Sequence, residues 1–182
     1  MSDYKSTLSA AEVITKRRRA LYTKKGYINL LIRIILLVAA SYILFTQVFL
    51  ITRAKGNDMF PAIKDGDLVV AFRLQKDYVK NDVVVYKVNE AAYLGRVVAR
   101  ETDVVTLDNS GKLLVNGTEQ RGEIVYPTLA KERINYPLRI EEKRLFVLGD
   151  HRMESTDSRD YGPLDLKQVK GKVITILRRR GL

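Results

Sequence analysis

The sequence predicts a mainly β domain of short antiparallel strands behind one N-terminal transmembrane helix. Two observations predict this architecture. The stretch from Ile34 to Ile51 is apolar and carries no charge, and a bilayer core of ~30 Å needs ~20 helical residues. After residue 54 the chain changes to short runs rich in β-branched and aromatic residues, separated by turn residues, which is typical of strands.

The composition excludes several classes of site. The 182 residues are enough for one ordinary domain with a short extension. They contain no cysteine and one histidine, so thiol chemistry, cysteine-ligated metals and multi-histidine metal sites are excluded. No Gly-rich phosphate loop is present. We therefore expect neither a metal nor a cofactor.

The basic residues concentrate before the apolar run. Residues 1–26 hold seven Lys or Arg against two acidic residues, out of a net charge of +11 for the whole chain. A nucleic-acid-binding domain would carry such charge on its folded surface, so we expect no nucleic-acid partner. Cytoplasmic flanks of membrane spans are enriched in Lys and Arg. We expect a cytoplasmic tail over 1–26, a transmembrane helix over 27–52 and an extracytoplasmic domain over 53–182.

Two other interpretations of the apolar run are weaker. The apolar part of a cleaved signal peptide usually spans ~7–15 residues and ends at small residues, whereas this run is longer and continues into Phe49-Leu50-Ile51. A buried core helix would show polar residues at a helical period, and none appear. Arg33 can extend its guanidinium toward the basic end of the span. The pattern favours a single-pass protein of the cell membrane.

The remaining chain is expected to form strands joined by tight turns. Asp108-Asn109-Ser110-Gly111 and Asn116-Gly117 are expected turns because Asn and Gly tolerate positive φ. Short helices are expected only near 127–133 and 165–169. The expected strands are 68–72, 83–86, 93–99, 104–107, 112–115, 145–148 and 172–177.

Three segments carry the functional signal. The first is Gly56-Asn57-Asp58-Met59-Phe60-Pro61, the second Tyr93-Leu94-Gly95-Arg96, and the third runs from Gly149 to Gly162 as GDHRMESTDSRDYG. Each has a simple structural explanation alone: a turn, a strand bulge or a solvated loop with surface ion pairs. Their order and spacing together are specific.

This arrangement resembles the type I signal peptidases of bacteria, which are membrane-anchored β-fold serine proteases. The resemblance covers about residues 27–180, and Val83, Val84 and Val85 look like the family strand that lines the substrate groove. It implies a peptide-binding groove formed by Met59, Pro61, Val83, Val84, Val85 and Tyr93. It also implies a structural active-site loop whose matching residues are Asp150, Ser155, Asp157, Ser158 and Arg159, with His151 in place of the family Asn.

The two residues that would carry the family's chemistry differ. The family uses a serine nucleophile and a neutral lysine base, but the matching positions hold Asp58 and Gly95. We therefore expect a catalytically inactive homologue that is not an enzyme. The alternative is an active serine endopeptidase for exported preproteins with relocated catalytic residues. His151 with Ser155 or Ser158, and Asp58 with Asp150 or Asp157, stay open as such arrangements.

The joint replacement is similar to the SipA-type signal-peptidase-like proteins found with Gram-positive pilus genes. That resemblance implies a cell-surface role in pilus assembly alongside a sortase. A β domain with a strand-edged groove can bind an extended peptide as an additional strand. The expected function is a membrane-anchored chaperone or scaffold whose partners are pilin subunits, with a sortase as a further partner.

Overall fold

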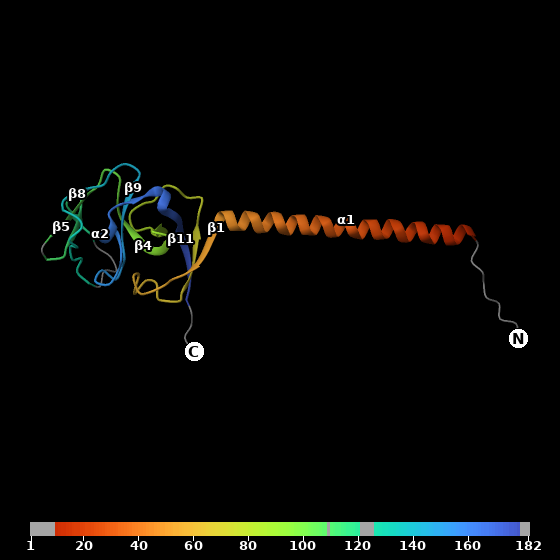
Figure 1. Cartoon of the computed structure of the whole chain (residues 1–182), viewed down its shortest axis with the longest axis horizontal. Helices are drawn as coiled ribbons and strands as arrows, with labels where there is room; N and C mark the ends of the chain where they lie inside the picture. Colours follow the sequence, from red (N-terminus) through yellow and green to blue (C-terminus); the bar gives the residue numbers. More distant parts are fainter. Residues whose placement is uncertain (1–9, 109, 121–125, 179–182) are drawn as a thin grey trace. The chain divides into compact units, whose positions relative to one another are not determined.

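The computed structural model describes residues 10–108, 110–120 and 126–178. The chain divides into two compact units, residues 1–46 and residues 47–182. The first contains most of one long helix, and the second contains the strands (Figure 1). Each unit is described by itself below.

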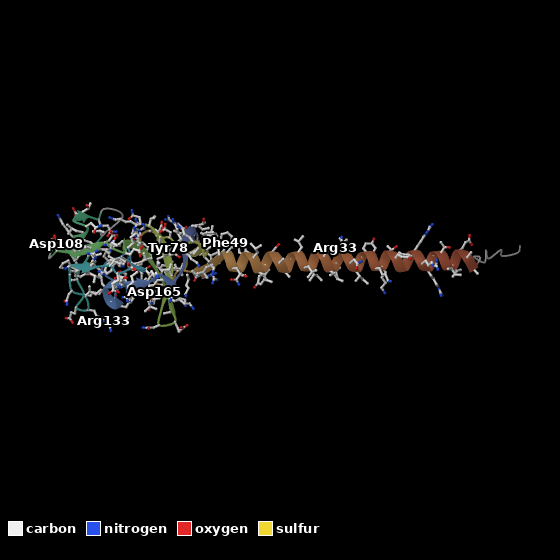
Figure 2. The ribbon with its side chains drawn as sticks, turned by 90° about the horizontal axis from the view of Figure 1, so that it is seen from above. Arg33, Phe49, Tyr78, Asp108, Arg133 and Asp165 are labelled. Atoms are coloured by element: carbon white, nitrogen blue, oxygen red, sulfur yellow. The ribbon has the colours of Figure 1, made fainter. Side chains whose placement is uncertain are left out.

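Helix α1 spans Ala10–Val48 and has 39 residues. It contains a segment long and apolar enough to cross a membrane, and Arg33 projects from it (Figure 2). The helix also takes in basic residues that we expected in a tail. It ends before the expected boundary at 52, because Phe49–Arg53 form strand β1 and pair with β2. Tertiary pairing here decides the conformation of the last residues of the apolar run.

The larger sheet has seven antiparallel strands in the order β1-β2-β11-β3-β4-β9-β10. The strands not yet given bounds are β2 Leu68–Phe72, β3 Val83–Val88, β4 Ala91–Arg100, β9 Arg144–Leu148, β10 Leu164–Asp165 and β11 Val169–Leu177. The last strand, β11, lies between β2 and β3. The expectation of a mainly β fold with short antiparallel strands is confirmed.

The smaller sheet has four strands in the order β7-β6-β5-β8. Their bounds are β5 Val104–Leu107, β6 Leu113–Val115, β7 Thr118–Glu119 and β8 Leu138–Arg139. Asn116 and Gly117 form the turn between β6 and β7 with positive φ angles of 53° and 77°, as their residue types predict. Asn109 lies outside the described residues.

Two short helical segments complete the described part of the domain. Helix α2 spans Ser158–Tyr161 and begins at the N-cap residue Asp157, whose side chain accepts a bond from the Arg159 amide. A 3₁₀ helix, η1, spans Leu166–Gln168 within the expected region. The expected helix near 127–133 is absent, because residues 127–131 have no regular structure and 132–133 form a turn.

Both faces of the larger sheet are covered, so neighbouring residues of one strand enter different cores. Val84 belongs to one buried cluster and Val85 to another. The first cluster comprises Tyr78, Val84, Tyr86, Val97, Leu145, Val147, Leu164 and Val169. The second, which underlies the candidate site, comprises Ala54, Met59, Ile63, Val69, Ala71 and Val85.

Candidate functional site: a cleft between two strand edges

A cleft of about 380 Å³ lies between the end of β1 and the β3–β4 hairpin. Strand β1 contributes Thr52 and Arg53, and the following loop contributes Lys55 and Asp58. The hairpin contributes the rest of the wall, which consists of Val85, Lys87, Glu90, Ala91, Ala92, Tyr93 and Leu94. The cleft thus collects residues from two segments, 52–58 and 85–94, that are separate in the sequence.

Asp58 is the partly buried acidic group of this cleft. Burial raises the pKa of its carboxyl group, and the nearby Asp157 carboxylate raises it further. His151 and Lys131 oppose this rise. The Asp58 side chain accepts no hydrogen bond from the described residues. It is therefore a titratable group that is available to a molecule in the cleft.

The loop after β9 is held by a buried ion pair. Arg159 and Asp157 each have side chains 1% exposed, and Arg159 Nη2 lies 2.8 Å from Asp157 Oδ2. A second bond joins Arg159 Nε to Asp157 Oδ1 at 2.9 Å. Ser155 Oγ and the Gly149 amide also donate to Asp157. Ser158 Oγ accepts from the Val147 amide at 3.0 Å. Both serines are thus engaged in the support of the loop.

The same loop meets the segment that carries Asp58. The His151 amide donates to the Asp58 carbonyl at 3.0 Å. A Cβ atom on Gly149 would lie 2.6 Å from that carbonyl oxygen, so only glycine permits this approach. On the neighbouring strand, Arg96 forms a bidentate pair with Asp150 at 2.8 and 2.6 Å. These contacts fix the backbone at Asp58.

Gly95 faces the first core cluster and does not line the cleft. A Cβ atom there would lie 2.5 Å from Val147 Cγ1 and 3.1 Å from Tyr86 Cε1. Tyr86 is fully buried, accepts a hydrogen bond from the Tyr161 hydroxyl and stacks on Tyr93 at 5.8 Å. The aromatic rings and Val147 therefore occupy the space that a side chain at position 95 would need.

The structure places the expected groove residues in two environments. Val85 and Tyr93 line the cleft. Met59 is 2% exposed and packs in the core beneath, while Val84 is fully buried on the opposite face of the sheet. Pro61 and Val83 are half-buried and do not line the cleft. Strand alternation explains the difference between Val84 and Val85, because consecutive side chains point to opposite faces of the sheet.

Sequence reasoning missed Lys131. Its Nζ donates to the Ser155 carbonyl at 2.9 Å and to both oxygens of Asp160 at 2.8 and 2.7 Å. It thereby brings a positive charge near Asp58. No local pattern indicates this role, because Lys131 comes from an irregular segment far from the loop in sequence. Among residues 10–108, 110–120 and 126–178, no group of three or more potential metal ligands gathers.

The fold and site define a class: an antiparallel β domain with a strand-edged cleft and a helix capable of spanning a membrane. The chain belongs to the signal peptidase family, peptidase S26, whose family model matches residues 27–177. That match confirms the superfamily resemblance.

Named relatives agree with this family. The chain is 33% identical to the probable thylakoidal processing peptidase 2 of Arabidopsis thaliana, over 65% of this chain and 35% of that protein. It is 28% identical to signal peptidase I of Bacillus caldolyticus, covering 65% and 74% of the two chains. It is 30% identical to signal peptidase IB of Staphylococcus aureus, covering 76% and 85%.

Coverage differs among the comparisons. The chain spans only about a third of the length of the Arabidopsis relative. Among solved structures, a signal peptidase I from Enterococcus faecalis matches with a TM-score of 0.44 and 22% identity. That match covers 54% of this chain and 97% of the other.

These relatives correct one expectation. We expected that the chain is not an enzyme, because Asp58 and Gly95 stand at the positions of the family's Ser and Lys. The relatives are named as peptidases, so this expectation is wrong. The replacement of the family's Ser and Lys by Asp58 and Gly95 does not by itself establish a loss of activity, because another group in the cleft can transfer protons. Asp58 remains a titratable group in the cleft.

Proposed function

We propose that this protein binds an extended segment of an exported polypeptide in the cleft between β1 and β4. The observation that carries this proposal is the presence of two open strand edges beside one cavity. In the described residues β1 pairs only with β2. Strand β4 pairs with β3 over Ala91–Arg96, but with β9 only from Arg96 onward. Open edges offer unpaired backbone groups to a further strand.

The geometry suits strand addition. Thr52 and Arg53 of β1 and Ala91 to Leu94 of β4 border the same cavity. An extended segment lying there gains main-chain hydrogen bonds from an edge, while side-chain contacts along the cleft provide specificity. Binding of this kind needs no particular reaction, so it is common to a chaperone and to a peptidase.

We place this domain on the outer side of the cell membrane, with residues before the span in the cytoplasm. The seven basic residues in 1–26 support this orientation. Since the chain has no cysteine, single cysteines introduced at Ser6 and Lys112 can report the topology in cells. A membrane-impermeant maleimide should label K112C and leave S6C unlabelled. The reverse labelling would overturn the orientation.

The polypeptide we assign to the cleft is a pilin subunit during pilus assembly, with a sortase as a further partner. The support is the resemblance to the SipA-type proteins, which rests on Asp58 and Gly95 together with the retained loop from Gly149 to Arg159. Deletion of the chain from its host should abolish pilus polymers and leave monomeric pilin at the cell surface. Normal polymers in the deletion strain would overturn this assignment.

A second candidate function is hydrolysis of the bound segment, and the names of the relatives favour it. In this candidate Asp58 carries the proton-transfer role, because a carboxyl with a raised pKa can exchange protons with a reacting group. Ser155 and Ser158 are less suitable, since both hydroxyls are engaged by the buried loop network.

One experiment separates these outcomes. The full chain in detergent is titrated into a fluorescein-labelled, strand-forming peptide, and the mixture is analysed by mass spectrometry for cleavage. Ala92→Trp fills the cleft and should weaken binding at least about tenfold, or ~1.4 kcal/mol. Val79→Trp, at an exposed position outside the cleft, is the matched control. A central proline in the peptide should also weaken binding, because proline lacks the amide donor.

The results have distinct meanings. Equal binding by A92W and wild type would overturn the proposed site. Cleavage that is lost in D58N would establish the hydrolytic candidate. Cleavage retained in D58N would remove Asp58 from that role.

A further inference from the structure

Three cations line the cleft without an ion-pair partner among the described residues. Arg53, Lys55 and Lys87 are all exposed and all border the cavity. Two other cations of the domain are paired, Lys131 with Asp160 and Lys172 with Asp82. The cleft therefore keeps positive charge that the fold itself does not neutralise.

The acidic residues of the cleft do not balance these cations. Asp58 and Glu90 are the two carboxyl groups in its lining. Burial raises the pKa of Asp58, which favours its neutral form. Glu90 lies at the tip of the β3–β4 hairpin with a φ angle of 65°. The cleft retains an excess of positive charge even when both groups are ionised.

We propose that the cleft selects extended segments that carry acidic side chains. The inference rests on the proposed peptide binding and adds the class of segment. Arg53 and Lys55 are two positions apart, and side chains on one face of an extended segment recur with the same spacing. A segment with Asp or Glu at alternate positions can thus place both carboxylates near cations, with Lys87 approaching from the hairpin.

The test compares three peptides that differ only at two alternate positions, which hold Glu, Gln or Lys. Binding to the full chain is measured by fluorescence anisotropy in neutral detergent at low and high salt. Exposed ion pairs are worth roughly two- to fivefold in affinity each, so the Glu peptide should bind best and the Lys peptide worst. High salt should reduce these differences, because it screens exposed charges.

Variants assign the effect to the cleft. Lys87→Gln should reduce the Glu-over-Gln preference by roughly two- to fivefold, and the triple variant R53Q/K55Q/K87Q should abolish it. Lys80→Gln is the matched control, since Lys80 is exposed and lies outside the cleft lining. It should leave the preference unchanged.

The outcomes separate this inference from the proposed function. Equal binding of all three peptides would overturn the acidic preference and leave the peptide site standing. No binding of any peptide would overturn the peptide site and the preference with it. A triple variant that keeps the Glu preference would place the recognition elsewhere. The last outcome concerns lipid. If the triple variant binds peptide as wild type does but is no longer stabilised against heat by phosphatidylglycerol, the cations bind lipid headgroups and the acidic preference is overturned.

Discussion

Removal of Arg159 should strongly destabilise the β domain. The Arg159 side chain is 1% exposed and donates to Asp157 through Nε and Nη2 at 2.9 and 2.8 Å. It also donates to the carbonyl of Arg152 at 2.6 Å. Loss of one partner of a buried pair leaves the other charge without compensation, at a cost of ~3–5 kcal/mol. For a domain of this size, that cost corresponds to a fall in Tm of about 10–15 °C.

The assay is thermal melting of the full chain in detergent, followed by near-ultraviolet circular dichroism of its tyrosines. Arg159→Met keeps the aliphatic volume and removes the charge. Arg144→Met is the control, because Arg144 forms an exposed pair with Glu141 and is itself 45% exposed. The control should shift Tm by no more than about 3 °C. The double variant D157N/R159M should recover part of the loss. An R159M protein that melts within about 2 °C of wild type would refute the buried-pair reasoning.

The remaining predictions concern the two replaced positions. Asp58→Asn should raise Tm at neutral pH, because the raised pKa of Asp58 means that its ionised form is disfavoured in the folded state. The Tm difference between D58N and wild type should vanish below pH 3.8, the ordinary pKa of an aspartate, and grow as pH rises through the pKa of Asp58 in the folded state. A constant Tm difference from pH 3 to 8 would contradict burial of the ionised carboxylate as its cause. Gly95→Ala should cost ~1–3 kcal/mol by overpacking, and Val147→Ala should relieve part of it. Additive losses in melts of G95A/V147A would show that the two sites do not clash.

Much of the fold was predictable because several strands have a clear local sequence pattern. The β-branched runs at 68–72 and 104–107 have the same bounds in the structure. Strand β1 was not predictable, because its residues continue an apolar helix-forming run and become a strand only by pairing with β2. The Asn89-Glu90 turn of the β3–β4 hairpin was also missed. Glu is an unusual residue at its φ angle of 65°.

The candidate site was only partly predictable. The motifs located Asp58 and the loop from Gly149 to Arg159, because those residues are close in sequence. Of the rest of the cleft wall only Val85 and Tyr93 were predicted, since the remainder depends on how far β4 extends beyond its pairing with β9. The sequence also did not indicate which side chains of strand β3 face the cleft. Val84 and Val85 look alike in sequence, yet Val85 lines the cleft and Val84 enters the opposite core.

The measurement that most directly tests the central claim is amide hydrogen exchange of the full chain with and without a bound strand-forming peptide. We predict that exchange slows at Phe49–Arg53 or Ala91–Gly95, because an added strand would engage the open edge of one or both. Strand β9, already paired with β4 and β10, should show little change. Peptide binding that leaves both edges unchanged, with new protection elsewhere, would contradict the account.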